Sequence, residues 1–185
     1  MLFRSRDTRN HPFIPSRGSL VNIRAEYIGG FLGGDDSFTL LEASWSRYQK
    51  VWPGWISATR IKGGHVREFG DSESVPFIDR YRIGGANTIR GFTEGSLGPS
   101  NIILIANQEF RFRLIGKLWS SVFADVGNGF RNDLEIRWNR LAVSYGVGLQ
   151  FISPAGPIRV DYARRLKSKY ISTGDKFHFT ILYAF

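Results

Sequence analysis

The stretch "LAVSYGVGLQF", Leu141–Phe151, alternates strictly between two kinds of side chain. Large apolar residues occupy every second position, and the positions between them are small or polar: Leu141, Val143, Tyr145, Val147, Leu149 and Phe151 against Ala142, Ser144, Gly146, Gly148 and Gln150. Successive side chains of a β-strand point to opposite faces of the sheet. A period of two therefore predicts a strand with one apolar face and one polar or small face.

The same alternation recurs on both sides of this stretch and predicts about eight full strands. A partial strand near Leu2–Thr8 precedes strands near residues 19–28, 38–50, 55–64, 101–114, 118–127, 140–152, 157–165 and 176–185. The pattern is less clean in residues 38–50 and 55–64. Strands of about ten residues are long enough to cross the hydrocarbon of a bilayer when they are tilted.

The connections between these strands differ in length and composition. One set is short and carries Pro or Gly, as in "NHPFIPSRG", "VWPG", "LIGK" and "ISPAG". The other set is longer and polar: "GGFLGGDD", residues 66–100, "NGFRNDLEIRWNR" and "KSKYISTGD". Short turns at one end and long loops at the other are typical of outer-membrane barrels. We therefore predict an all-β fold, an antiparallel transmembrane β-barrel.

A soluble β-sandwich is the alternative, because alternation alone does not distinguish a lipid-facing side from a packed core. Aromatic residues near the strand ends favour the barrel, since they resemble an aromatic girdle. Charges in the middle of the opposite faces, such as Glu109, Arg111 and Asp161, are compatible with a polar lumen. A solvated sandwich surface would hold them equally well.

Composition argues against several functional classes. The net charge is +9, from 25 basic and 16 acidic residues, but the basic residues form no run, so we expect no nucleic-acid partner. The sequence has no cysteine, and its three histidines lack the spacing of metal ligands. We expect neither a metal nor a cofactor, and no enzymatic activity. Glu109 and Asp125 are better explained as partners of arginines in a polar lumen than as a catalytic pair.

Several motifs, in the same order along the chain, resemble the carboxy-terminal half of the barrel in BamA/TamA-like outer-membrane insertases. These insertases form the bacterial surface antigen family, within the two-partner-secretion transporter superfamily. "RYRIGGANTIRGFTEGSLGP" resembles the family's sixth extracellular loop, through Gly84, Gly85, Ile89, Arg90, Gly91 and Phe92. "SVFADVGNGF" resembles its F-x-D-x-G strand, through Phe123, Asp125 and Gly127. The last strand resembles a carboxy-terminal assembly signal, through Phe177, Phe179, Ile181, Tyr183 and Phe185.

The resemblance implies one outer-membrane barrel domain over residues 1–185, either half of a sixteen-stranded barrel or a shortened family member. Residues 1–8 would be a partial strand, and residues 66–100 a long extracellular loop that folds inward. The implied function is assembly and insertion of outer-membrane proteins, or protein translocation across the outer membrane. A bacterial outer membrane is favoured over that of an organelle.

The implied partners are outer-membrane lipid, client outer-membrane or secreted proteins, and either a second copy of the chain or the missing amino-terminal half of the barrel. Two other functions stay open. The chain is alternatively a structural or anchoring barrel of a larger exported protein, such as a patatin-like lipase carrier, or a simple pore. Upstream docking domains would favour the insertase, and an upstream lipase domain the anchor.

The loop suggests a specific contact for Arg90. Eight strands enclose a space just wide enough for side chains, so residues 66–100 are too bulky for such a barrel. We expect an open sheet, a larger shared barrel, or a loop that lies outside. Arg90 is expected to bind Asp125 through its forked guanidinium, with Glu109 as a second acceptor. The alternative is an exposed loop arginine bound only to water.

Overall fold

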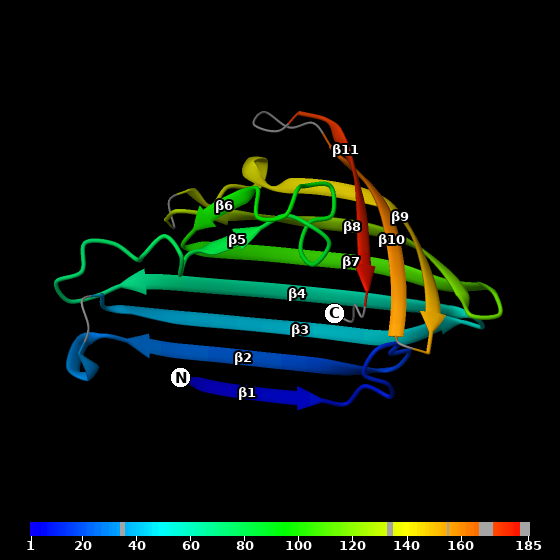
Figure 1. Cartoon of the computed structure of the whole chain (residues 1–185), viewed down its shortest axis with the longest axis horizontal. Coiled ribbons are helices and arrows are strands. Elements are labelled where there is room, and N and C mark those ends of the chain that lie inside the picture. The colour runs from blue at the N-terminus through cyan, green and yellow to red at the C-terminus, as the bar shows by residue number, and fades with distance from the viewer. Residues whose placement is uncertain (34–35, 133–134, 155, 167–171, 182–185) are drawn as a thin grey trace.

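A computed structural model of the chain describes residues 1–33, 36–132, 135–154, 156–166 and 172–181. Its main feature is a nine-stranded antiparallel sheet in which each strand pairs with its neighbours in the chain (Figure 1). The strands, in sheet order, are β1 (Leu2–Asp7), β2 (Gly18–Ile28), β3 (Phe38–Trp52), β4 (Trp55–Glu68), β7 (Ile102–Ile115), β8 (Leu118–Phe130), β9 (Ala142–Ser153), β10 (Gly156–Arg165) and β11 (Gly174–Ile181).

Between β4 and β7 the chain forms a small hairpin that does not join the main sheet. Its strands are β5 (Tyr81–Ile83) and β6 (Leu97–Ser100), which pair only with each other among the described residues. The described 3-10 helices are η1 (Gly30–Leu32) and η3 (Trp138–Arg140). No helix in the described ranges is long and apolar enough to cross a membrane.

The predicted strands all form, with small shifts at their ends. The largest difference is in β4, which continues to Glu68 rather than ending near Gly64. The connection expected at residues 66–100 consequently begins after Glu68 and ends before Ile102. The hairpin β5–β6 within it was not predicted, because three or four residues are too few to establish a period. The end of the last predicted strand, residues 182–185, lies outside the described residues.

The two faces of the sheet have opposite character, and the opening stretch shows this most directly. In β9 the outward side chains of Tyr145, Val147 and Leu149 are 47–51% exposed, whereas Ala142 and Ser144 are completely buried. The inward face buries charged residues as well, while most large exposed apolar side chains lie on the outward face. A soluble sandwich would bury its apolar face against a second sheet, so this arrangement fits a sheet that faces lipid.

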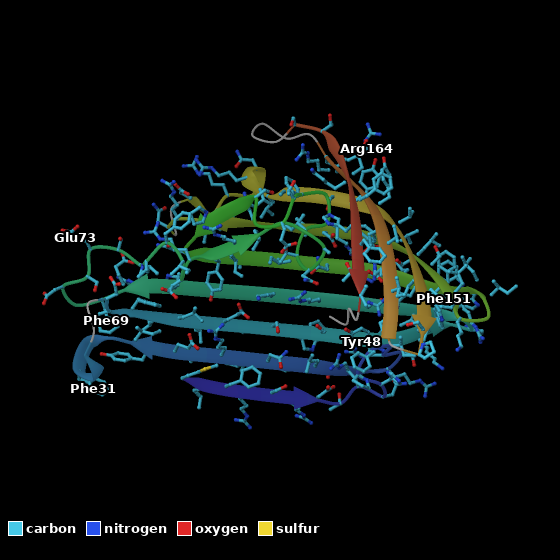
Figure 2. All side chains as sticks on the ribbon, in the orientation of Figure 1. Phe31, Tyr48, Phe69, Glu73, Phe151 and Arg164 are labelled. Atoms are coloured by element: carbon cyan, nitrogen blue, oxygen red, sulfur yellow. The ribbon has the colours of Figure 1, made fainter. Side chains whose placement is uncertain are left out.

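Aromatic side chains lie near both ends of the strands. Phe151 is near the end with the short turns, and Phe31 and Phe69 are near the end with the long connections (Figure 2). The ring of Tyr27, at the end of β2, lies 4.8 Å from that of Phe69. Aromatic rings at both borders of an apolar band are typical of the two membrane interfaces.

One polar residue interrupts the apolar outward face of β7, and its hydrogen bonds are satisfied locally. Gln108 accepts a hydrogen bond from Thr59 Oγ1 at 2.6 Å and donates one to Ser57 Oγ at 2.9 Å. Both partners are on the neighbouring strand β4. A polar side chain without such partners would be costly against lipid, so the three residues form a self-contained polar group.

The sheet curls so that its inward face is concave, and the hairpin β5–β6 lies on the concave side (Figure 1). Within the described ranges β1 and β11 make no backbone pair with each other, and the sheet is open. The sequence between β5 and β6, which contains Gly84–Phe92, packs against the wall formed by β7–β10. This contact is the most deeply buried part of the chain.

Candidate functional site

The loop that reaches the inner wall turns at a pair of glycines. Gly84 and Gly85 have φ angles of 106° and 104°, a conformation that residues with a Cβ rarely adopt. The Gly84 N–H donates to Thr88 Oγ1 at 2.8 Å, and the Gly85 N–H donates to the Ile89 carbonyl at 3.2 Å. A Cβ on Gly84 would lie 2.5 Å from the backbone carbonyl oxygen of Thr93. The turn therefore requires glycine for both conformation and space.

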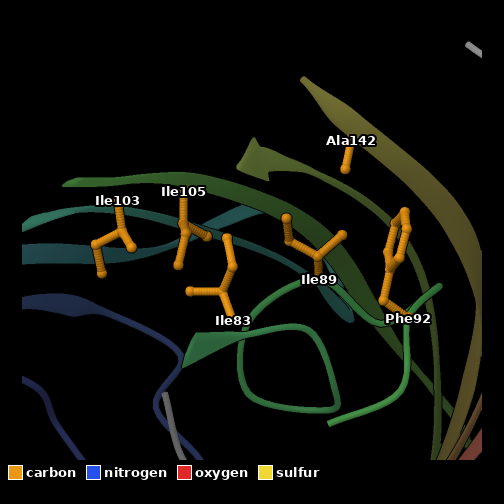
Figure 3. Close-up of a cluster of buried hydrophobic side chains, with 6 residues drawn as sticks. All are labelled: Ile83, Ile89, Phe92, Ile103, Ile105 and Ala142. Carbon is orange, nitrogen blue, oxygen red and sulfur yellow. The ribbon is translucent and has the colours of Figure 1, made fainter. Parts of the chain in front are cut away.

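Two apolar residues of the loop hold its tip against the wall. Ile89 is fully buried, and Phe92 is 3% exposed. They belong to a cluster with Ile83 of β5 and three wall residues, Ile103, Ile105 and Ala142 (Figure 3). The buried apolar area stabilises the tip by about 1.5–3 kcal/mol for each large side chain. The contact thus fixes the position of the residue between them, Arg90.

Gly91 allows the loop backbone to approach β9 closely. Its N–H donates to Ser144 Oγ at 3.2 Å. A Cβ at this position would lie 2.6 Å from Ser144 Cβ and 3.0 Å from Arg165 Cβ. The first distance is shorter than real Cβ contacts, so the glycine is needed for space and not for its φ angle.

Arg90 is 1% exposed and binds Asp125 of β8 in a bidentate manner. Its Nε donates to Asp125 Oδ2 at 2.8 Å, and its Nη2 donates to Asp125 Oδ1 at 2.7 Å. The backbone N–H of Arg90 also donates to Asp125 Oδ2, at 3.1 Å. The guanidinium lies over the ring of Phe123, 3.3 Å from its centroid. The bidentate hydrogen bonds and the flat contact with the ring of Phe123 therefore both suit the planar guanidinium of arginine.

Glu109 of β7 extends this contact into a network. It accepts from Arg90 Nη1 at 2.7 Å, from Arg111 Nε at 2.6 Å and from both terminal nitrogens of Arg159 at 2.8–2.9 Å. Arg159 also binds Asp161 through two hydrogen bonds of 2.7 Å. Three arginines and three carboxylates thus share one buried site and balance in formal charge, which is the condition under which buried charges are tolerated.

The neighbours of Arg90 favour its charged form, which a guanidinium already holds at neutral pH. Burial by itself lowers the pKa of the guanidinium, but hydrogen bonding to Asp125 and the charges of Glu109 and Asp125 more than offset it. The net effect raises the pKa of Arg90, so the loop carries a permanent positive charge into the wall. Glu109 and Asp125 both serve as acceptors of arginine in this geometry.

Some residues of the site were not anticipated. His178 of β11 hydrogen-bonds through Nε2 to the backbone carbonyl of Arg90, which connects the last described strand to the loop tip. Asn107 Nδ2 donates to Asp125 Oδ1 at 2.9 Å and to the Thr88 carbonyl at 2.6 Å. The sequence pattern identifies Asp161 only as a charge on the polar face. Alternation predicts the face on which each residue lies, but not which distant strands the curl of the sheet brings together.

The remaining predicted residues lie away from the network or outside the description. Gly127 is two residues beyond Asp125 on β8, where a Cβ would lie 2.3 Å from the Leu104 carbonyl oxygen. Phe177, Phe179 and Ile181 are 56–74% exposed and share the outward face of β11. Tyr183 and Phe185 lie outside the described residues. Among the described residues, no group of acidic and histidine side chains could hold a metal ion.

Comparison with known proteins finds matches that agree with one another. The Omp85 superfamily domain matches residues 4–185. The chain is 28% identical over 171 residues, 85% of its length, to the outer membrane protein assembly factor BamA of Nitratidesulfovibrio vulgaris. It is 24% identical, over 78% of its length, to the chloroplastic outer envelope protein 80 of Arabidopsis thaliana. It is 35% identical, over 51% of its length, to the sorting and assembly machinery component 50 homolog of Xenopus tropicalis.

A solved structure shares the fold. BamA from Haemophilus ducreyi lacking POTRA domains 1–3 aligns with a TM-score of 0.82 and 24% identity, over 96% of this chain and 40% of that one. The chain spans only about a fifth of the length of the curated relatives, between 20% and 22%. The described sheet therefore corresponds to one part of a larger architecture in those proteins.

Proposed function

This chain belongs to the Omp85 superfamily, and we propose that it forms part of a barrel that inserts and assembles proteins in an outer membrane, bacterial rather than organellar. The names of two of the relatives refer to assembly, and the bacterial BamA match extends over 85% of the chain. Residues 1–185 would be a single barrel domain, with Leu2–Asp7 as a partial strand. The connection between β4 and β7 would be an extracellular loop folded into the lumen.

The observation that carries this proposal is the junction at Arg90. Its side chain binds β7 and β8, and its carbonyl accepts a hydrogen bond from His178 on β11. One residue of the loop thus contacts both the wall and the described edge of the sheet. An insertase needs an edge strand held in a defined position, since unpaired backbone groups in lipid are costly and favour pairing with an incoming strand.

In this proposal the network keeps β7–β11 curled, and β11 offers its free backbone edge to a client strand. Pairing would be transient, because the client must leave when its own barrel closes. The partners are client outer-membrane proteins, membrane lipid and the remaining strands of the barrel. An anchoring barrel or a pore would need the same curled sheet, but it would not need an accessible edge strand.

Client folding in liposomes tests the proposal. The full-length protein is reconstituted into liposomes, and the folding rate of an unfolded client barrel is followed by its heat-modifiable migration. We expect faster folding than in empty liposomes, and a loss of most of the acceleration in the Arg90→Ala variant. A matched control is Arg67→Gln, an exposed arginine near the end of β4 on the outward face, opposite to the network. Equal rates with and without the protein would contradict the insertase function.

A further inference from the structure

A groove with basic lining lies at the unpaired end of β3, at the end of the sheet with the short turns, and it opens partly on the outward face. It forms where β3 outruns β2, since Gly18, the first residue of β2, pairs with Tyr48, and β3 continues to Trp52. The groove has a volume of about 440 Å³. It is lined by residues from the start of β2 and the end of β3, with Arg17 from the preceding turn: Arg17, Gly18, Ser19, Trp45, Arg47, Tyr48, Gln49 and Lys50. Trp45, Arg47 and Gln49 face outward, whereas Tyr48 and Lys50 have the inward parity of β3.

The charges of the groove have one sign. Arg17, Arg47 and Lys50 are all exposed, and no Asp or Glu occurs among the described residues that line the groove. Arg6 extends this basic surface along β1, because it pairs with Val21, which is itself opposite Trp45 on the outward face. The Ser5 hydroxyl binds Asn22 on the inward face, which confirms that Arg4 and Arg6 point outward.

Apolar surface begins immediately beside these cations. Trp45 lines the groove and is 36% exposed, and its neighbours across the strands are Val21 and Ile61. Ile61 is 52% exposed on the same face. Trp52 and Trp55, at the tip of the β3–β4 turn, are 74% and 41% exposed. Tryptophan and basic side chains together mark the level at which a membrane changes from acyl chains to headgroups.

We propose that this groove binds the headgroup of an anionic phospholipid in the leaflet at the short-turn end. The phosphate would contact Arg47 and Arg17, and the acyl chains would lie along Trp45 and Ile61. A phospholipid matches both halves of the surface, whereas an acidic peptide would leave the apolar half uncovered. Arginine and lysine near anionic lipid contribute by charge, so affinity should fall with salt. The inference rests on the proposed membrane placement, but not on client insertion.

Native mass spectrometry of the full-length protein in nonionic detergent tests the site. Phosphatidylglycerol is titrated in, with phosphatidylcholine of the same acyl chains as the uncharged comparison and excess inorganic phosphate as a competitor. We expect tighter binding of phosphatidylglycerol. The Arg17→Gln, Arg47→Gln double variant should bind it roughly 30-fold more weakly, about fivefold for each charge removed. The control, Arg67→Gln with Arg131→Gln, removes the same charge near the opposite end and should bind normally.

The outcomes separate the possibilities. Equal binding of the two lipids, unchanged affinity in the double variant, or displacement by inorganic phosphate would each overturn the headgroup site. If the double variant does not fold by heat-modifiable migration, Arg47→Gln alone decides the matter, with an expected fivefold loss. Lipid binding is measured without any client, so a failed client-folding assay leaves this result unaffected, and a failed lipid titration leaves the insertase proposal unaffected.

Discussion

Two arginine–carboxylate pairs on the inner wall have the same sequence spacing but different surroundings. Arg24 and Glu26 are two residues apart on β2, and their two hydrogen bonds measure 2.9 and 3.0 Å. Arg159 and Asp161 have the same spacing on β10, with two hydrogen bonds of 2.7 Å. The side chain of Arg24 is nevertheless 43% exposed, whereas that of Arg159 is 3% exposed.

We attribute the difference to the loop rather than to the strands. The loop tip that carries Arg90 lies against β7–β10, whereas the pair on β2 is part of a wall segment that the tip does not reach (Figure 1). Arg159 shares Glu109 with Arg90, so its pair belongs to the covered network. The same spacing of arginine and carboxylate therefore gives a solvated pair in one place and a buried network in the other. The energetic value of each should differ accordingly.

The largest effect is expected from breaking the covered network at its centre. Arg90→Ala leaves Asp125 buried without its bidentate partner, and Asp125→Ala leaves the guanidinium buried beside Glu109. Each should lower the free energy of unfolding by about 3–5 kcal/mol. The measurement is guanidinium-induced unfolding in detergent or liposomes, followed by tryptophan fluorescence and heat-modifiable migration.

The double variant sharpens this result. If Arg90 and Asp125 act as one unit, the double alanine variant should be little worse than either single variant. Arg90→Lys keeps the charge but loses the fork and the flat contact with Phe123, so it should recover only part of the loss. Fully additive losses would show that the two residues stabilise the chain independently.

A smaller effect is expected at Gly91, where the loop touches β9. Gly91→Ala places a Cβ 2.6 Å from Ser144 Cβ, so the tip must shift, at a cost of about 1–3 kcal/mol. Gly63→Ala is the matched control, because its Cβ would make only ordinary contacts, the nearest at 3.8 Å. Both are measured by the same unfolding assay. Combining Gly91→Ala with Ser144→Gly should restore part of the stability, and an absence of any restoration would contradict the steric explanation.

The sequence predicts the strands well because alternation is a local signal. Each stretch such as Leu141–Phe151 carries its own period, and the two kinds of connection separate the ends of the barrel. Asp125 and Glu109 were assigned to the inward face by the same period, while the family resemblance suggested Arg90 as their partner. The structure brings all three together.

The rest of the site depends on the curl of the sheet, which has no local signal. His178 and Arg90 are 88 positions apart, and Gly91 and Ser144 are 53 apart. Neither contact follows from knowing the face of the sheet on which a residue lies, because many other residues lie on the same inward face. The hairpin β5–β6 was missed for the opposite reason, since its strands are too short to show alternation. Long-range contacts of this kind require either the structure or a known relative.

His178 tests whether the network extends to β11. His178→Ala removes one hydrogen bond to the Arg90 carbonyl and should cost about 0.5–1.5 kcal/mol, less than any change at Arg90 itself. His178→Gln keeps a donor and should cost less than alanine. In the client-folding assay, the alanine variant should slow folding more than its small stability loss explains, if β11 is positioned through this contact. A stability loss without any effect on client folding would separate β11 from the loop function.

The smallest effect is expected at the exposed pair on β2, Arg24 and Glu26. Glu26→Ala removes the carboxylate of a pair whose arginine is 43% exposed, so water replaces the lost contact and the cost should lie within about 0.2–1 kcal/mol. The loss should shrink further at high salt, because screening acts on exposed pairs more than on buried ones. Unfolding of this variant beside Asp161→Ala, the equivalent change in the pair on β10, measures what the loop adds to an ordinary ion pair. If Glu26→Ala were as costly as Asp161→Ala, then cover by the loop would not be the cause of the difference. The strength of both contacts would then lie in the strand geometry that they share.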